Sequence, residues 1–325
     1  MATLRMLTAA GAAMLAITAV SAMAQEQGYP SRPIRLIVGV SPGGSTDLIA
    51  RLVAGRLTAR LGQQVVVDNR SGASGIIAAR LVGQSQPNGY TLMLAGASIS
   101  IVGSLYTQAK FDVQRDLEPV ALVAATPYVM VAHPSIGVKT VAGLIKYAKA
   151  NSGKISHGAG AAGTVQHLSG EIFKRMAGIN MTYVPYKGSS DMLVDALAGR
   201  LEVAMDNVVL LAPYIRKGSL YPLAVTTAKR TPILPDVPSF DESGMTGFDA
   251  SGWFSMYGTV KTPARIIGKL NREIVSILNE PEVRERLLTF GATPLLGTQD
   301  DLRKQLAREV PKWRKVIQEA GVKLQ

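Results

Sequence analysis

Two glycine-rich turns in the sequence each precede a helical pattern, and each could bind an anion. In the first turn, Gly43 and Gly44 follow an apolar run of strand length, residues 34–40, and apolar residues recur at helical spacing from Leu48 onward. Glycines let the backbone approach a ligand, and the first N–H groups of a helix point outward with the positive end of the helix dipole behind them. The alternative is an ordinary turn in which Ser45 only caps the helix. This motif alone favours the alternative, because such turns occur throughout α/β proteins.

The second turn, residues 158–163, reads Gly-Ala-Gly-Ala-Ala-Gly and matches the G-x-G-x-x-G pattern of dinucleotide-binding folds. It follows a short strand pattern at residues 154–157 and precedes a helical pattern that begins at Thr164. A dinucleotide site would need an acidic residue at the end of the next strand, but residues 184–187 read Val-Pro-Tyr-Lys. We therefore expect no nucleotide cofactor and interpret the turn as a second anion site that faces the first.

Other side chains that could do chemistry give weaker signals. The histidines are His133, His157 and His167; they form no HExxH motif and no i, i+4 pair, so we predict no metal site. No G-x-S-x-G motif is present, and we predict no catalytic residue. His167, in the first turn of the second helix, could donate to a carboxylate or bond to its own loop. Asp206 ends a strand pattern, where it could bind a ligand amine or hydroxyl, the role we favour, or cap the next turn.

The composition is that of an exported protein with a large core. Residues 1–24 combine a basic Arg5, a mostly apolar run and an Ala-Met-Ala pattern, so we expect a secretory signal that is cleaved after Ala24. The 325 residues include no cysteine and 47% are hydrophobic, so a buried core, not disulfides, must hold the fold. The net charge of +12 suits anionic partners, but no Lys/Arg-rich run is present. We therefore expect a small anionic solute as partner and no nucleic acid.

Strand and helix patterns alternate along the chain, as they do in folds with parallel sheets and helical crossovers. The long apolar stretch 117–133 is interrupted by Thr126 and Pro127, and a central strand does not easily carry a proline. We interpret this point as a crossing between two domains. A second alternating set runs to Thr226, and residues 251–260 form a strand pattern that returns the chain to the first domain. The helical tail after it most simply covers that first domain.

The predicted fold is therefore α/β with two lobes, each a mainly parallel sheet flanked by helices. Lobe 1 comprises residues 29–125 and 250–325, and lobe 2 comprises residues 126–249. A ligand would bind in the cleft between the lobes. Hinge residues near Thr126 and Thr226 would let the lobes close on it.

Several short motifs together resemble one family. They are Ser-Pro-Gly-Gly-Ser-Thr-Asp at 41–47 followed by Ala-Arg at 50–51, and the segments 65–73, 87–92, 160–168, 184–188 and 236–238. In this order they closely resemble the periplasmic solute-binding receptors of tripartite tricarboxylate transporters, also called the Bug family, and the resemblance spans the mature chain. It implies a two-lobed Venus-flytrap fold of the type II kind. It also implies capture of a small carboxylate in the periplasm, without a cofactor, and delivery through transient contact with a membrane permease. We expect a monomer.

In receptors of this family, backbone N–H groups at the glycine-bordered helix starts hold the ligand carboxylate. Carried over by motif, the resemblance assigns ligand binding to Gly43, Gly44, Ser45, Thr46, Asp47 and Ser98 on lobe 1, and to Gly160, Ala162, Gly163, Thr164, His167 and Asp206 on lobe 2. The second loop has alanines where the family more often has polar residues, and Ser45 stands where many members have glycine. These departures predict that side-chain selectivity differs while the backbone contacts to the carboxylate remain.

Two other functions fit the same residues. One is an exported hydrolase or isomerase of small carboxylic acids that uses Asp47, His167 or Asp206 as a general base. The other is a ligand sensor that signals through a membrane partner, which would share the fold of the receptor. The prediction we adopt is a non-enzymatic receptor.

Overall fold

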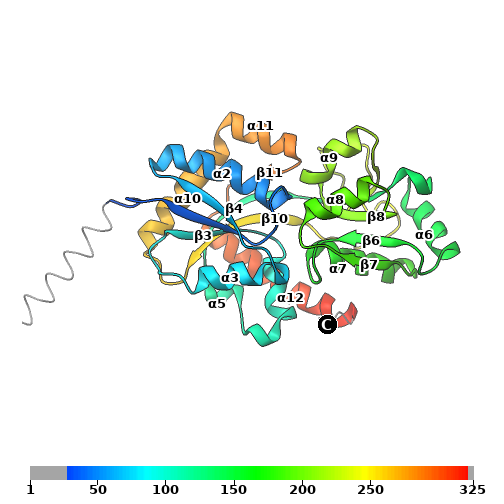
Figure 1. Ribbon diagram of the computed structural model, residues 1–325, viewed down its shortest axis with the longest axis horizontal. Coiled ribbons are helices and arrows are strands. Elements are labelled where there is room, and N and C mark those ends of the chain that lie inside the picture. Colours follow the sequence, from blue (N-terminus) through cyan, green and yellow to red (C-terminus); the bar gives the residue numbers. More distant parts are fainter. Residues whose placement is uncertain (1–27, 321–325) are drawn as a thin grey trace, which may run out of the picture.

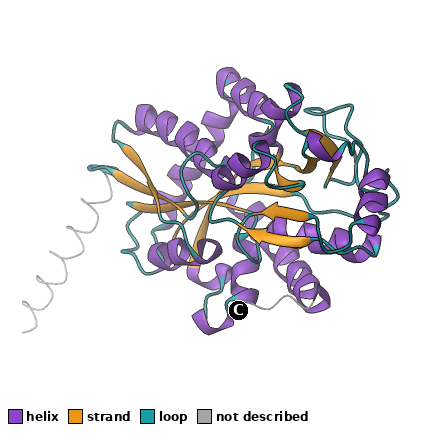
Figure 2. Ribbon diagram, turned by 45° about the vertical axis from the view of Figure 1, so that its right-hand side comes forward, coloured by secondary structure: helices purple, strands orange, loops and turns teal. Residues whose placement is uncertain are grey.

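The structure is a computed structural model that describes residues 28–320, so the secretory signal predicted at residues 1–24 lies outside the described residues. It contains two lobes side by side, each built on one β-sheet with helices packed over it (Figures 1 and 2). This arrangement agrees with the two-lobed α/β fold predicted from the sequence. No helix within residues 28–320 has the length and apolar character needed to span a bilayer.

The first sheet consists of β1 (Ile34–Val38), β2 (Val65–Asn69), β3 (Thr91–Gly96), β4 (Leu117–Thr126), β10 (Gly252–Thr259) and β11 (Thr293–Pro294). Its strand order is β11-β4-β10-β3-β1-β2. Strands β1, β2 and β3 are parallel, whereas β10 runs antiparallel between β3 and β4. The short β11 pairs antiparallel with the outer edge of β4.

The second sheet consists of β5 (Tyr128–Ala132), β6 (Ser156–Ala159), β7 (Thr182–Pro185), β8 (Val203–Asn207) and β9 (Tyr221–Val225), in the order β7-β6-β8-β5-β9. Strands β6, β7 and β8 are parallel, and β5 is antiparallel to both β8 and β9. Both sheets are therefore mixed: most of their strands run in one direction, as predicted, while β5 and β10 run against their neighbours. The antiparallel strands β5 and β10 enter their sheets from the other lobe, so no helical crossover within the lobe sets their direction.

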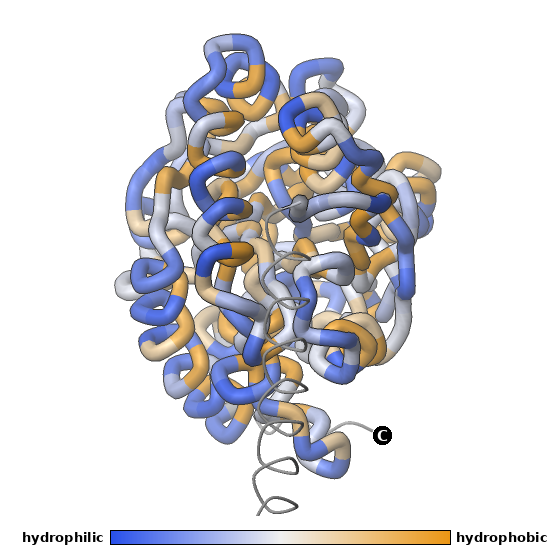
Figure 3. The backbone as a smooth tube through the Cα atoms, turned by 90° about the vertical axis from the view of Figure 1, so that its left-hand side faces the viewer, coloured by the Kyte–Doolittle hydropathy of each residue, from blue (hydrophilic) through white to orange (hydrophobic). Residues whose placement is uncertain are grey.

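Helices cover both sheets. Those on the first lobe are α2 (Ser45–Leu61), α3 (Ile76–Gly83), α4 (Ile99–Leu105), α5 (Val113–Asp116), α10 (Ala264–Asn279), α11 (Pro281–Phe290) and α12 (Gln299–Ala320). Those on the second lobe are α6 (Val141–Ala150), α7 (Val165–Ala177), α8 (Ser189–Leu197) and α9 (Val208–Arg216). In α10 the buried residues Ile267, Leu270, Ile274 and Ile277 recur every three or four positions. Figure 3 shows the same alternation of hydrophilic and hydrophobic turns along the outer helices.

The two segments that connect the sheets are hydrogen-bonded to each other. Pro127 separates β4 in the first sheet from β5 in the second. The Thr226 N–H, just after β9, donates to the Tyr128 carbonyl at 3.0 Å, and its hydroxyl donates to the Ala250 carbonyl at 2.7 Å. The crossings thus lie side by side, as two strands of one narrow hinge would.

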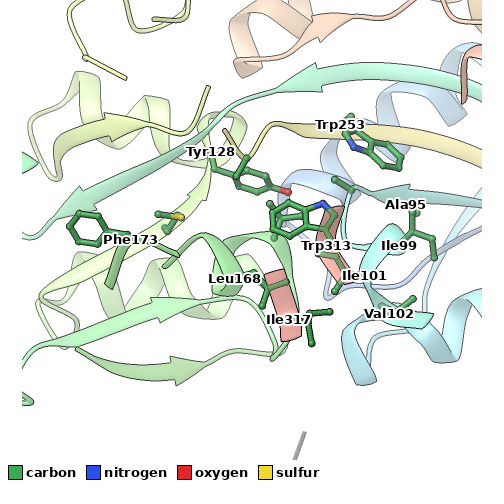
Figure 4. Close-up of a cluster of buried hydrophobic side chains, with 14 of the residues drawn as sticks. Ala95, Ile99, Ile101, Val102, Tyr128, Leu168, Phe173, Trp253, Trp313 and Ile317 are labelled. Atoms are coloured by element: carbon green, nitrogen blue, oxygen red, sulfur yellow. The ribbon is translucent and has the colours of Figure 1, made fainter. Parts of the chain in front are cut away.

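The C-terminal helix α12 packs on both lobes, although the sequence predicted that the tail covers the first. It contacts α4 and β4 of the first lobe and α7 of the second. Its Trp313 is fully buried in a hydrophobic cluster with Ile101 of α4 and Leu168 of α7 (Figure 4). Helix α12 therefore braces the junction between the lobes, and Trp313 is the largest side chain in that brace.

Candidate functional site

A cavity of about 120 Å³ lies between the lobes, at the carboxyl ends of the parallel strands of both sheets. Its first-lobe wall is formed by the ends of β1, β3 and β10 and by the starts of α2, α3 and α4. Its second-lobe wall is formed by the turn after β6, the starts of α7 and α8, and the end of β8. Many helix N-termini therefore face one small volume, and each contributes outward-pointing N–H groups and a partial positive charge.

On the first lobe, the start of α2 leaves donors open. The cap Gly44 is extended, with φ −78° and ψ 170°, and has no side chain to bond the first N–H groups of the helix. Within residues 28–320, no intramolecular hydrogen bond uses the N–H groups of Ser45 or Thr46. Both residues are buried, and both line the cavity. This helix start has the geometry of an anion site.

On the second lobe, the cavity is lined by Gly160 and Thr164 at the start of α7, and by Lys187, Gly188 and Ser189 at the start of α8. Lys187 is the one charged residue in the cavity wall, and its side chain is largely exposed at the rim. The α8 segment was quoted only as part of the family resemblance, so the sequence reasoning did not assign it to the site. In the structure, the start of α8 is a further helix N-terminus that borders the cavity.

The lobes touch each other around the cavity through direct hydrogen bonds. The Asn207 amide donates to Ser45 Oγ at 2.9 Å, and the Val165 N–H donates to Ser98 Oγ at 3.2 Å. On another side, the Ser74 hydroxyl donates to the Ala162 carbonyl at 2.6 Å. The structure is therefore a closed form, in which residues of both lobes surround the same volume.

The loop at residues 72–75 lines the cavity too, although the sequence analysis did not assign it to the site. Ala73 and Ser74 both adopt positive φ, at 45° and 55°. Residues other than glycine rarely hold this conformation unless the surroundings enforce it, and such residues concentrate at ligand sites. The sequence signal that could have identified this loop is the pair Gly72 and Gly75, which lie on either side of the small residues Ala73 and Ser74.

Asp47, expected to contact the ligand, instead lies behind the cavity wall. Its carboxylate accepts hydrogen bonds from the Gly43 N–H at 2.9 Å, from Arg51 at 2.8 Å and from Asn69 at 3.0 Å. Burial alone would raise the pKa of Asp47, but these hydrogen bonds outweigh it and hold the pKa below its ordinary value. The group is ionised and already paired, so it shapes the loop and is poorly suited to act as a general base.

His167 also lies outside the cavity wall and bonds to its own loop, the second of the two roles predicted for it. Its Nδ1 accepts the Gly163 N–H at 3.0 Å, and its ring packs on Tyr183 with centroids 4.0 Å apart. Burial, and then the positive charge of Lys174, lower the pKa of His167 to about 4. The ring is neutral near pH 7. Because His167 takes the Gly163 N–H, that N–H does not point to the cavity.

Asp206 is fully buried directly behind the second-lobe wall. Its Oδ1 accepts the N–H of Asn207 at 2.6 Å, and the side chains of Ser189 and Gln166 also hydrogen-bond the carboxylate. Burial raises the pKa of Asp206 to about 6, although the nearby side chains of Ser189 and Gln166 partly oppose the shift. Gln166 and Asn207, which both line the cavity, separate this carboxylate from the first lobe. The sequence analysis did not assign Gln166 to the site.

Of the other predicted site residues, Ser45, Thr46, Ser98, Gly160 and Thr164 line the cavity. Gly43, Gly44, Ala162 and Gly163 lie in the adjacent turns and contact the opposite lobe or its side chains. The structure thus brings both predicted glycine turns to one cavity, with most of their polar groups committed to shaping it.

Comparison with known proteins identifies the family. Residues 49–322 match the family described as "Tripartite tricarboxylate transporter family receptor". The chain is 37% identical over 312 residues to Protein BugT of Bordetella pertussis, which covers 95% of this chain and 96% of BugT. The solved structure of R. palustris Rpa4515 with adipate is 37% identical, with a TM-score of 0.88 over 91% of this chain and 99% of that one.

Two further solved structures agree. The periplasmic binding protein BugD is 33% identical, with a TM-score of 0.87 over 91% of this chain and all of that one, 100%. MatC from Rhodopseudomonas palustris with bound malate is 27% identical, with a TM-score of 0.84 over 89% of this chain and 100% of that one. The chain belongs to the tripartite tricarboxylate transporter receptor family, whose members are solute-binding receptors.

Proposed function

We propose that this protein is a periplasmic receptor that encloses one small carboxylate between its lobes and presents it to a tripartite membrane permease. The observation that carries the proposal is the cavity between the lobes, onto which the open N–H groups of Ser45 and Thr46 face. Relatives with the same fold hold adipate and malate. The receptor binds its ligand without changing it: of the three candidate general bases, Asp47 and His167 are committed to their own loops, and Asp206 is fully buried outside the cavity lining.

The α2 start supplies binding energy without any cationic side chain. A hydrogen bond to a charged group contributes about 1.5–3 kcal/mol, so roughly three such bonds would support micromolar binding after the cost of closing the lobes. Opening and closing about the paired crossings at Pro127 and Thr226 gives the ligand its path.

A pair of substitutions at Ser45 tests the backbone site. Ser45→Pro removes the first N–H of α2, and proline suits this helix position because its φ is already helical. The preceding Gly44, at φ −78° and ψ 170°, has the extended conformation that a residue before proline adopts. Ser45→Ala is the control, since it removes the same hydroxyl and keeps the N–H.

The measurement is calorimetric titration with adipate, malate and the uncharged diamide of adipate, together with melting temperatures. We expect the carboxylates to bind, the diamide not to bind, and Ser45→Pro to weaken binding roughly tenfold or more relative to Ser45→Ala at unchanged melting temperature. Conversion of a bound acid into another compound would contradict the receptor function, and equal affinity of the two variants would contradict the backbone site.

A further inference from the structure

The outer side of α12 carries positive charge with little negative charge among it. The inner side of the helix is buried and consists of Leu302, Leu306, Val310, Trp313 and Ile317. The outer side, which we call the basic face, carries the cationic side chains of Arg303, Lys304, Arg308, Lys312, Arg314 and Lys315. Between residues 302 and 318 the one acidic residue is Glu309, whose side chain is 12% exposed and accepts the Trp313 indole N–H at 2.8 Å. The acidic residues of α12 otherwise lie at its two ends.

The rest of the protein neutralises the basic face only in part. Arg303 is paired with Glu118 at 2.6 Å and with Asp300 at 2.8 Å. Arg308 donates to the neutral side chain of Gln305 at 2.6 Å. Within residues 28–320, no salt bridge reaches Lys304, Arg308 or Arg314. The centre of the face therefore keeps its charge.

Helix α11 shows what an ordinary solvated helix of this protein looks like. Its exposed charged residues alternate in sign along the chain: Glu282, Arg284, Glu285 and Arg286. Mixed signs keep a surface soluble without creating a field of one sign. The basic face of α12 departs from this pattern, which indicates attraction to an anionic partner.

The geometry of the basic face suits a flat partner. Lys304, Arg308, Lys312 and Lys315 recur every three or four residues, so they form one stripe, about 17 Å long at 1.5 Å per helical residue. The outward positions beside this stripe, at residues 307 and 311, hold a small alanine and a proline. No large hydrophobic side chain is exposed on the part of α12 that the structure describes. The charged ends of the side chains are therefore what the face offers.

These properties favour a membrane surface over a macromolecule. Protein interfaces have an apolar or aromatic centre and are depleted of lysine, and the basic face has the opposite composition. Single-stranded nucleic acid is held by stacking on aromatic side chains, but Trp313, the aromatic residue of α12, is fully buried. Anionic phospholipids present many phosphates in one plane and attract clusters of Lys and Arg without any apolar contact. With its apolar side covered, α12 would lie on such a surface and not insert.

We propose that α12 docks the protein on anionic phospholipid headgroups through its basic face. This goes beyond the proposed function and does not depend on which solute binds. Helix α12 lies in the lower half of the molecule in Figure 1, whereas α2, α8 and α9 lie in the upper half. Docking through α12 therefore leaves the upper side free for a permease in the same membrane, and confinement to the membrane surface brings the two together more often.

Vesicle binding tests the inference. Vesicles of phosphatidylcholine with about 30% phosphatidylglycerol should pellet the protein, whereas pure phosphatidylcholine vesicles should not. Raising the salt from about 0.05 M to about 0.5 M should release the protein, because screening shortens the reach of the charges. Deuterium exchange with and without vesicles should show protection along residues 299–320, and this measurement needs no variant.

A pair of matched variants assigns the binding to α12. The first variant combines Lys304→Gln, Arg308→Gln and Lys315→Gln, and leaves Lys312 in place because its ammonium group lies 5.3 Å from the Trp313 ring centroid. The control removes the same charge from exposed lysines of lobe 2 far from α12, in or after α6, with Lys146→Gln, Lys149→Gln and Lys154→Gln. The α12 variant should bind anionic vesicles roughly tenfold or more weakly, and the control should change binding less than threefold. Melting temperatures and malate or adipate affinities should stay the same in both.

Three outcomes would overturn the inference. If the wild type does not bind anionic vesicles, there is no membrane site, and if both variants weaken binding equally, net charge and not α12 is responsible. If soluble polyglutamate at the same charge concentration binds more tightly than the vesicles, the face takes an acidic protein instead. The proposed function is judged separately, by whether the protein binds malate or adipate in solution.

Discussion

The starts of α2 and α7 are the same local structure built once in each lobe. Gly43 and Gly163, which precede the helix caps, have nearly equal positive φ values of 80° and 78°. The caps, Gly44 and Thr164, are both extended, with φ of −78° and −75°. The sequence showed two glycine turns, but their different residues concealed that the backbones repeat.

The repeat extends to a side chain three residues after each cap. The Gly43 N–H donates to the carboxylate of Asp47 at 2.9 Å, and the Gly163 N–H donates to the ring of His167 at 3.0 Å. An acidic residue and a neutral histidine thus do the same work at equivalent positions. Each fixes its glycine turn from behind, which explains why neither side chain faces the cavity.

The two starts differ in what they leave for a ligand. Thr164 accepts the His167 N–H at 3.4 Å, whereas Gly44 has no side chain and leaves the equivalent donors open. At α7 the Val165 N–H is also taken, by Ser98 of the other lobe. One backbone motif therefore leaves the first N–H groups of α2 open, whereas at α7 the N–H groups of Val165 and His167 are already bonded.

The largest expected effect is a difference in folding stability between a glycine substitution in α7 and one in α2, the helices that follow these turns. Gly170 in α7 faces the fully buried His157, and an added Cβ would lie 2.1 Å from the ring. Gly170→Ala should therefore destabilise the protein by about 3 kcal/mol, because the packed ring has no room to move. Gly55 in α2 has no atom within 4 Å of an added Cβ. Gly55→Ala should stabilise by about 0.5–1 kcal/mol, and urea unfolding of both variants measures the difference.

The next comparison concerns the glycines before the caps. Alanine at either site should cost about 1 kcal/mol of folding stability, since both φ values are positive. At Gly163, however, the new Cβ would lie 1.8 Å from Leu105 of the opposite lobe, whereas at Gly43 the nearest atom, in Ser190, is 3.9 Å away.

Gly163→Ala and Gly43→Ala should therefore differ in ligand affinity, although their folding stabilities should be similar. Gly163→Ala should lower affinity at least tenfold, because Leu105 must move before the lobes close, whereas Gly43→Ala should lower it less than threefold. Calorimetry and urea unfolding of both variants supply the two numbers. Equal affinities would mean that the turns play equal parts in closure, contrary to the structure.

The elements were easier to predict than the site. Strand and helix periodicity placed the patterns at residues 34–40, 154–157, from 164 and 251–260 within about two residues of β1, β6, the start of α7 and β10. Helix α4 (Ile99–Leu105) was not predicted, because its 7 residues are too few to show a clear helical period. The crossing was located at Thr126 and Pro127, where the structure passes from the first sheet to the second.

The sequence predicted only those site residues that belong to a recognisable local motif. Glycines mark a turn, so Ser45, Thr46 and Thr164 followed from the sequence. Whether an N–H is open or already bonded depends on contacts between distant residues, such as Val165 with Ser98. Gln166 looks like any polar helix residue until the fold places it at the cavity. The free donors and acceptors of a site are thus properties of the fold, and no local pattern encodes them.

Acidification should affect the two turns at different pH. The pKa of His167 lies at about 4, below its ordinary value of 6.5, so the unfolded chain binds the proton first and stability falls as the pH drops from 6.5 towards 4. The pKa of Asp47 is lowered too, so its contribution is lost only below its ordinary value of 3.8.

His167→Asn isolates this effect, because an asparagine oxygen can accept the Gly163 N–H and does not titrate. Between pH 6.5 and pH 4 the wild type should lose up to about 1.4 kcal/mol per pH unit more than this variant, measured by urea unfolding. Asp206 titrates in both proteins, whereas the charge of His167 is one of the causes that lower the pKa of His157, so the difference also contains that coupling. Asp47→Asn should show no comparable difference above pH 4, and parallel curves for His167→Asn and wild type would contradict the assigned role of His167.

The smallest expected effect comes from exchanging the caps. Thr164→Gly gives α7 the cap of α2, and should cost only a few tenths of a kcal/mol because glycine is itself an acceptable cap. Gly44→Ser gives α2 a side-chain cap, and an added Cβ lies 3.7 Å from Ser189, which is ordinary contact. The serine hydroxyl would accept an N–H of the first turn that now faces the cavity region. Stability should rise by up to about 1 kcal/mol while carboxylate affinity falls a few-fold, so the stabilising and weakening effects of one substitution would have the same origin. If affinity stayed constant as stability rose, the open donors of α2 would not be what holds the anion.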